Sequence, residues 1–218
     1  MTTYDPRLLD KYAELAVKVG VNLQEGQRLA LFSGMGMTGV PVQLSPLVRA
    51  VTKHAYLVGA KYVNVLWDDQ QLHLIRLQHG RSASLEEFPD WRVETLVAYM
   101  DAGDAVLSIY AQDPDMMAGQ DPAVLQTLNR VAVEKMAPAA AHTRSGLINW
   151  SLISGATEPW AQKVFPDLAP EEAQAKLWET IFDICRVSVN DPIAAWQHHV
   201  GQLAMRSHYL NSKQYRVL

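Results

Sequence analysis

The segment Gly34-Met35-Gly36-Met37-Thr38-Gly39 is the sharpest chemical motif in this 218-residue sequence. It directly follows a short apolar run, and its spacing is that of the G-x-G-x-x-G pattern, which brings backbone N–H groups close to a pyrophosphate. Asp68, at the end of the next apolar run, stands where an acid would hold a ribose hydroxyl. These residues raise a first hypothesis, that loop 34–39 binds a nucleotide or another small ligand.

The surroundings of loop 34–39 weaken the nucleotide hypothesis. In a dinucleotide-binding fold the helix begins inside the glycine motif, so that its first N–H groups face the phosphate. Here Pro46 would break a helix begun near Gly36, so the helix is expected to start at Ser45-Pro46. The separation of Gly39 and Asp68 also exceeds the usual spacing of about 20 residues. A flexible glycine-rich connection is the stronger interpretation, and nucleotide binding is kept as the alternative.

A second group of side chains could ligate a metal ion. Asp68-Asp69 follows an apolar run, and His73 and His79 come shortly after it. Carboxylates and imidazoles are ordinary metal ligands. Adjacent aspartates in an extended chain point to opposite faces, however, and the histidine spacing matches no compact metal motif. A solvated exit from strand to loop is the better interpretation of these residues.

The other reactive residues predict packing rather than catalysis. His198 and His199 are neighbours on an expected helix, where successive side chains diverge by about 100°. We expect His199 to pack beside Trp196 and His198 to be solvated. Cys185 continues an apolar stripe and is expected to be buried and inert. No serine has a nucleophile-elbow context. The sequence therefore assigns no catalytic residue, no cofactor-binding residue and no metal ligand.

The elements that position these residues alternate between strand and helix. Apolar runs predict strands over 28–33, 62–67, 105–110 and 147–154, with a further short strand at 72–77. Helical spacing and caps predict helices over 5–20, 45–59, 93–103, 121–136, 160–165, 171–186 and 193–210, with a short turn at 84–87. Such alternation implies βαβ units. We predict a doubly wound α/β fold with a mainly parallel sheet of about four to five strands and a helical carboxyl-terminal tail over about 157–210.

Composition excludes several classes of protein. Hydrophobic residues make up 49% of the chain and charged residues 19%, which is typical of a globular protein. The net charge is −4 and the basic residues are scattered, so no nucleic-acid partner is expected. The amino terminus lacks the pattern of a secretion signal, and charges interrupt the most apolar region, 47–67, so no membrane span is expected. A single cysteine fits a reducing, cytoplasmic location.

The final residues of the sequence have a pattern of their own. The last helical stretch breaks at Asn211-Ser212, and Gln214-Tyr215-Arg216-Val217-Leu218 begins an alternating, β-branched and aromatic run. A strand cannot satisfy its backbone groups alone. We therefore expect residues 1–210 to be an α/β amino-terminal domain, and 211–218 to begin a linker or strand that leads into a catalytic domain absent from this sequence.

Several segments in a fixed order carry a resemblance to a known family. They are Lys11–Leu23, Gly26-Gln27, Ala55-Tyr56, Gly59-Ala60, Trp67, Asp113-Pro114, Ala118-Gly119, Asp121-Pro122, Pro159-Trp160-Ala161, Val164-Phe165-Pro166, Leu177-Trp178, Asp191-Pro192, Trp196, His199 and Leu210-Asn211. In this order they resemble the amino-terminal domain of the aminopeptidase T / aminopeptidase S family of metal-dependent aminopeptidases. The resemblance covers essentially the whole chain, although loop 34–39 is richer in glycine than the family pattern.

The resemblance implies an enzyme that removes N-terminal residues from peptides and forms a homodimer when full length. Its separate carboxyl-terminal domain would bind two divalent metal ions, zinc, cobalt or magnesium, through glutamates, histidines and an aspartate. None of those positions falls within this chain. The segment alone is therefore expected to bind no metal and to be inactive, and its expected role is to shape the substrate chamber or the subunit contacts.

Overall fold

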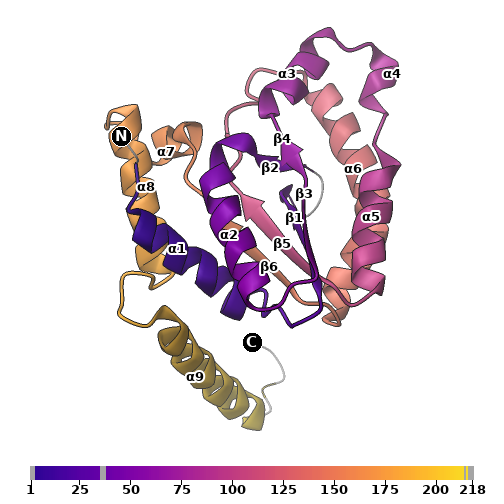
Figure 1. Ribbon diagram of the computed structural model, residues 1–218. Helices are drawn as coiled ribbons and strands as arrows, with labels where there is room; N and C mark the ends of the chain where they lie inside the picture. Colours follow the sequence, from indigo (N-terminus) through magenta and orange to yellow (C-terminus); the bar gives the residue numbers. More distant parts are fainter. Residues whose placement is uncertain (1–2, 35–37, 214, 216–218) are drawn as a thin grey trace.

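A four-stranded parallel sheet forms the centre of the structure, a computed structural model that describes residues 3–34, 38–213 and 215 (Figure 1). The strands are β1 (Arg28–Phe32), β3 (Tyr62–Val65), β5 (Ala105–Tyr110) and β6 (Trp150–Ser154). Their order is β3-β1-β5-β6, and every neighbouring pair is parallel. The order reverses between β1 and β5, as in a doubly wound fold. The predicted α/β class is confirmed.

Helices cover both faces of this sheet (Figure 1). The helices of the first face are α1 (Pro6–Leu15), the π-helix η1 (Ala16–Gly20), α2 (Ser45–Leu57), α7 (Glu158–Val164) and α8 (Pro170–Ile184). The second face carries α5 (Asp90–Asp101) and α6 (Pro122–Ser145). Each face has its own buried apolar cluster. Within β5, Leu107 and Ile109 belong to the first cluster and Val106 to the second, as expected for a strand buried on both sides.

Three helices begin with the same Asp-Pro pair, and the structure shows why. The side chains of Asp5, Asp121 and Asp191 each accept a hydrogen bond from a backbone N–H of the first turn, at 2.8, 2.8 and 2.9 Å. The proline that follows has no N–H to leave unpaired, and its fixed φ suits a first helical residue. These caps place the starts of α1, α6 and α9 (Pro192–Ser212) where the sequence predicts them.

Tyr12 of α1 reaches the edge strand β6. Its hydroxyl donates a hydrogen bond to the carbonyl oxygen of Ser154 at 3.0 Å and accepts one from the N–H of the same residue at 3.2 Å. The side chain is buried, and burial raises the pKa of Tyr12 above its ordinary value. This phenol therefore fixes the first helix to the last strand of the sheet.

An ion pair joins the amino-terminal ends of the two central strands. Asp104, just before β5, is buried and accepts hydrogen bonds from the backbone N–H of Arg28 at 2.7 Å and from its Nε at 2.6 Å. The guanidinium of Arg28 lies 4.3 Å from the centre of the Tyr99 ring. The carboxylate thus bonds both the backbone and the side chain of Arg28, which aligns β1 with β5.

The predicted strand at 72–77 is wrong, because this segment lies in the helix α3 (Gln70–His79). Asp69 is the N-cap of this helix, since its side chain accepts a hydrogen bond from the N–H of Gln71 at 3.0 Å. The apolar pattern of the segment gives no sign of this helix start. Every residue of α3 is half-buried or exposed. A short helix, α4 (Ser82–Leu85), follows, close to the predicted turn at 84–87.

The predicted strand at 62–67 divides in two. After β3, the chain forms β4 (Trp67–Asp68), which pairs in parallel with β2 (Val40–Pro41) above the carboxyl edge of the main sheet (Figure 1). A 3-10 turn, η3 (Val42–Leu44), then leads into α2. The small second sheet therefore brings Val40 and Pro41, just after Gly39, next to Trp67 and Asp68.

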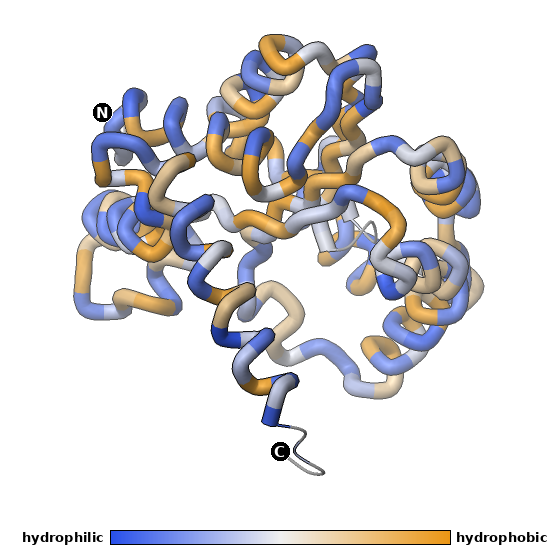
Figure 2. Tube along the Cα trace, turned by 90° about the horizontal axis from the view of Figure 1, so that it is seen from below, coloured by the Kyte–Doolittle hydropathy of each residue, from blue (hydrophilic) through white to orange (hydrophobic). Residues whose placement is uncertain are grey.

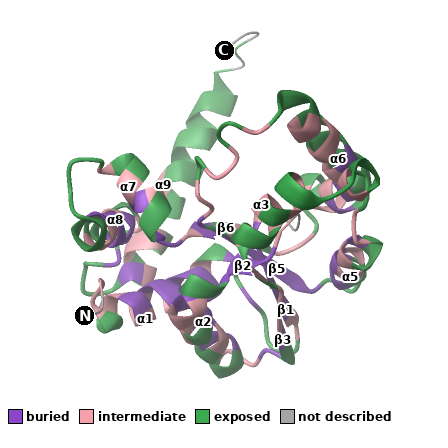
Figure 3. Cartoon of the chain, turned by 90° about the horizontal axis from the view of Figure 1, so that it is seen from above, coloured by how far each residue is buried: buried purple, intermediate pink, exposed green. Residues whose placement is uncertain are grey.

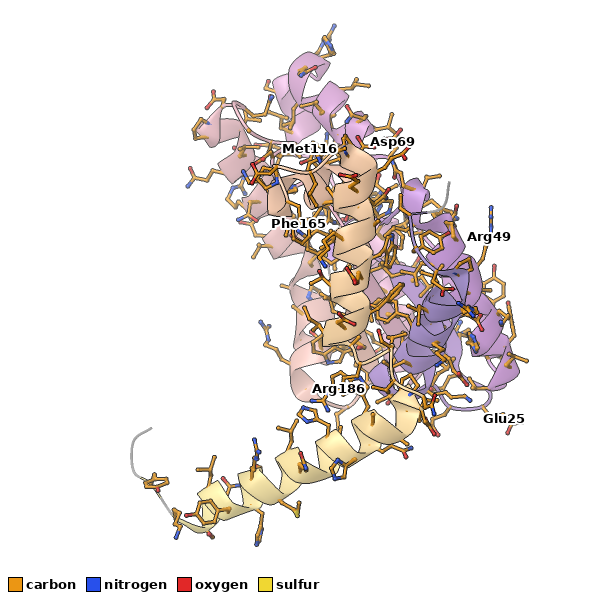
Figure 4. The ribbon with its side chains drawn as sticks, turned by 90° about the vertical axis from the view of Figure 1, so that its left-hand side faces the viewer. Glu25, Arg49, Asp69, Met116, Phe165 and Arg186 are labelled. Carbon is orange, nitrogen blue, oxygen red and sulfur yellow. The ribbon has the colours of Figure 1, made fainter. Side chains whose placement is uncertain are left out.

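The predicted helical tail separates into a packed part and a projecting part. Leu177, Trp178 and Phe182 of α8 are buried in the first cluster, whereas α9 extends away from the body (Figure 4) and is largely exposed (Figure 3). Among the described helices, none is long and apolar enough to cross a membrane. The strand predicted over 214–218 falls almost wholly on residues outside the described ranges and stays a prediction.

Candidate functional site

The loops after β1 and β5 bind each other where the strand order reverses. Ser33 and Thr38 exchange backbone hydrogen bonds at 2.9 and 3.3 Å, which closes the loop between them. Gln112, two residues after β5, donates hydrogen bonds from Nε2 to Ser33 Oγ and Thr38 Oγ1, both at 2.9 Å. Polar side chains at this switch point, where open α/β sheets commonly bind ligands, are therefore bonded to one another.

Gly39 of the glycine motif serves the packing of two strands. A Cβ at this position would lie 2.5 Å from the carbonyl carbon of Trp67, which is main chain and cannot move aside alone. The N–H of Val40 donates to the carbonyl of Leu66 at 2.7 Å. The absence of a side chain at Gly39 therefore lets the backbone of β2 come close to that of β4. The following helix, α2, starts at Ser45 as predicted, and Gly36 lies outside the described residues. This geometry gives the nucleotide hypothesis no support.

Asp68 and Asp69 diverge, as their adjacency predicts, but Asp68 is not the solvated residue we expected. Its side chain is only 8% exposed, and Oδ2 accepts hydrogen bonds from His73 Nε2 at 2.7 Å and from the N–H of Gly39 at 3.3 Å. Asp69 instead caps α3, where His79 is the last, exposed residue. The described residues contain no group of three or more His, Cys, Asp or Glu placed to hold a metal ion.

The Asp68–His73 pair predicts a dependence of stability on pH. Burial by itself raises the pKa of Asp68, but the hydrogen bond and charge of His73, the hydrogen bond from the N–H of Gly39 and the charge of Arg92 together hold that pKa below its ordinary value. The contribution of Asp68 to stability should thus be complete above pH about 4 and be lost as pH falls through the lower pKa of the folded state. Urea unfolding of the wild type and of Asp68→Asn should differ by about 1 kcal/mol at pH 6, and by less below pH about 4. A difference that grows at low pH would contradict this.

A cavity of about 350 Å³ opens at the same carboxyl edge of the sheet. Asp69, Asp113, Glu158 and several glutamines are among the residues that line it, and no lysine or arginine among the described residues does. Figure 4 shows the labelled Asp69 and Met116, from two of the contributing regions, together at the end of the body opposite to Arg186. Carboxylates and amides accept hydrogen bonds from ammonium and peptide N–H groups, so this cavity suits the end of a peptide better than a phosphate.

Hydrogen bonds hold the walls of this cavity in place. Gln70 Oε1 accepts from the N–H of Asp113 at 3.0 Å, which joins α3 to the loop after β5. Thr157 Oγ1 donates to the carbonyl of Ala111 at 2.9 Å, and Gln174 Nε2 donates to that of Ala156 at 2.9 Å. The sequence singled out Asp68 and Asp69 near this cavity but gave no sign of the glutamines. No spacing rule could find them, because they come from separate elements far apart in the chain.

The remaining candidates lie far from this cavity, at the start of α9. Trp196 and His199 form an edge-to-face contact at 5.6 Å, with His199 half-buried and His198 exposed, as predicted. Cys185 is half-buried rather than fully buried, and burial raises the pKa of its thiol. Its carbonyl accepts a hydrogen bond from Trp196 Nε1 at 2.7 Å. These residues anchor a helix.

Comparison with known proteins decides the family. The sequence model of the thermophilic metalloproteases, M29, matches residues 6–218. This chain belongs to the M29 metalloprotease family. The aminopeptidase T / aminopeptidase S resemblance is thereby confirmed.

Several named aminopeptidases match nearly all of this chain. It is 44% identical over 96% of its length to aminopeptidase 2 of Geobacillus stearothermophilus, and 31% identical over 96% to aminopeptidase AmpS of Bacillus subtilis. The solved structure of wild-type AmpT from Thermus thermophilus superposes with a TM-score of 0.86 at 32% identity, covering 96% of this chain. The chain spans 49% of the length of the first relative, 50% of the second and 49% of the solved AmpT chain.

Proposed function

We propose that this chain is the amino-terminal domain of a metal-dependent aminopeptidase that removes N-terminal residues from peptides. The match of nearly all of this chain to about half of proteins named aminopeptidases carries the proposal. In it, residues 1–210 form the domain and 211–218 lead into a second domain, which binds two divalent ions, zinc, cobalt or magnesium. One cysteine in 218 residues supports a reducing, cytoplasmic location.

In this proposal the present domain contributes shape and recognition rather than metal ligands. The cavity at the carboxyl edge of the sheet supports such a role, because its carboxylates would attract the ammonium group of a free peptide terminus. When the metal ions are bound in the second domain, they supply an activated water and polarise the scissile carbonyl. The full-length enzyme would form a homodimer, in which this domain shapes the substrate chamber or the subunit contacts.

Activity measurements test this assignment directly. The 218-residue chain alone should not hydrolyse an aminoacyl anilide when cobalt or zinc is added. The same chain joined to the half of Geobacillus stearothermophilus aminopeptidase 2 that it does not match should hydrolyse it, and a chelator should abolish the activity. We expect a rate at least about 10³-fold above that of the chain alone, because the metals would supply most of the acceleration.

The second half of aminopeptidase 2 alone, with the same metals, is the matched control. Activity of the isolated 218-residue chain would contradict the proposal, because it would place a catalytic site within residues 1–218. An inactive joined protein that nevertheless folds cooperatively would contradict it as well, since this chain would then not replace the first half of its relative.

A further inference from the structure

One apolar stripe runs along α9 and continues beyond the part of the helix that contacts the body. Ile193, Trp196, Val200, Leu203 and Leu210 follow each other at intervals of three, four, three and seven residues, which keeps them on one helical face. Ile193 and Trp196 pack against the first apolar cluster. Val200, Leu203 and Leu210 are 51%, 48% and 47% exposed. Figure 2 shows hydrophobic positions among hydrophilic ones along this helix.

The start of α9 is held firmly, so its outer half is presented in a fixed direction. Trp196 Nε1 donates to the carbonyl of Cys185, and the guanidinium of Arg186 lies 5.9 Å from the Trp196 ring centre. Lys11 Nζ donates to the carbonyls of Val189 and Asn190 in the connection before the helix, at 3.1 and 3.4 Å. An exposed half-helix gains little stability from its own hydrogen bonds. Its apolar face is therefore suited to a partner.

The apolar surface continues from the stripe into a groove on the body. A cavity of about 320 Å³ lies between η1, β6 and α9, and apolar side chains, including Val19, Leu152 and Val200, form most of its wall. Leu152 of β6 is 46% exposed. The groove and the stripe meet at Val200, so a single partner segment could cover both.

Charge indicates the chemistry of that partner. From Pro192 to Lys213 the chain has no aspartate or glutamate, but it has Arg206 and Lys213, although the whole chain carries a net charge of −4. Two copies of α9 would bring like charges together, which disfavours self-association through this face. A partner with an apolar strip bordered by acidic side chains fits it.

We propose that the stripe of α9 and the adjoining groove seat the second half of the same polypeptide, the half that the relatives possess beyond the region matched here. This rests on the proposed function. The M29 match runs through residue 218, so α9 lies inside the region shared with proteins about twice as long. Through this contact, the projecting helix α9 would set the relative orientation of the two domains.

Limited trypsin digestion tests the contact without requiring activity. In the isolated chain, cleavage after Arg206 should be fast, because the outer half of α9 is exposed and packs against no other described part of the chain. In the protein joined to the second half of aminopeptidase 2, cleavage after Arg206 should be at least tenfold slower. Leu203→Glu should restore fast cleavage in the joined protein, because a carboxylate would enter an apolar contact with an acidic border. Rates come from mass spectrometry of the digest.

Met205→Glu is the matched control, because Met205 is 68% exposed and lies on the opposite side of α9 from Leu203. It should leave Arg206 protected in the joined protein, and neither variant should change the melting temperature of the isolated chain. Equal cleavage rates in the isolated and joined proteins, or protection that survives Leu203→Glu, would overturn the inference. So would concentration-dependent protection of the isolated chain, which would make a second copy the occupant. An inactive joined protein with Arg206 protected would count against the proposed function alone.

Discussion

Replacing Phe182 with alanine is expected to lower the free energy of unfolding by about 4 kcal/mol. Phe182 is 2% exposed and lies where α8 meets α1. Its ring stacks on Trp178 at a centroid distance of 5.4 Å and meets the edge of Tyr12 at 5.9 Å. The truncation would remove both aromatic contacts and leave a cavity that the surrounding rings are too rigid to fill. Urea unfolding followed by far-UV circular dichroism measures the change.

Ile184→Ala is the matched control for the Phe182 substitution. Ile184 lies two residues later on the same helix and is 71% exposed, so its truncation should change stability by less than about 0.5 kcal/mol. Phe182→Leu should fall between the two variants, because leucine fills part of the space. If Phe182→Ala and Ile184→Ala were equally stable, α8 would not be docked through this ring.

The second large effect is expected from Arg28→Met, which should destabilise the fold by about 3 kcal/mol. The substitution keeps an apolar stem beside Tyr99 but removes the guanidinium from the buried Asp104. That carboxylate would retain the hydrogen bond from the backbone N–H of residue 28 to Oδ1 and lose the guanidinium, whose Nε and Nη2 both contact Oδ2. Thermal and urea unfolding at neutral pH measure the loss.

A double-mutant cycle separates the ion pair from simple packing. The double variant Arg28→Met, Asp104→Ala should be more stable than Arg28→Met alone, because it also removes the charge left buried without a cation. If the two single effects merely added, the pair would contribute through contact area rather than through charge. The surface pair Arg130 and Glu134, 3.2 Å apart and exposed, is the matched control and should show coupling below about 0.5 kcal/mol.

Local signals in the sequence predicted much of this fold. Asp-Pro pairs fixed three helix starts because a side-chain acceptor and a residue without an N–H satisfy the first turn together. Continuous apolar runs identified the central strands, since strands buried on both faces need no polar alternation. Their order across the sheet was beyond reach, because strand order depends on which helices cover each face.

The failures have equally local causes. The run at 72–77 resembles a strand, but Asp69 begins a helix ahead of it. Apolar spacing predicts the helix after Asp121 only as far as Met136, yet α6 continues through Pro138 to Ser145. It does so because Ala139 is buried against the second cluster and His142 Nε2 bonds Asp101 of α5 at 2.7 Å. At the candidate site, the burial of Asp68 depends on His73 and Gly39, a contact that no spacing rule describes.

The hydrogen bonds of the Tyr12 hydroxyl bear on whether copies of this molecule aggregate through the sheet edge. An edge strand with free backbone groups is a template for other chains, and β6 carries the exposed apolar residues Trp150 and Leu152. Tyr12 bonds both the N–H and the C=O of Ser154, so the last residue of β6 has no free backbone group to offer another chain. At Ser154, protection of this edge against pairing with another chain therefore depends on the first helix, and we expect it only once α1 has docked.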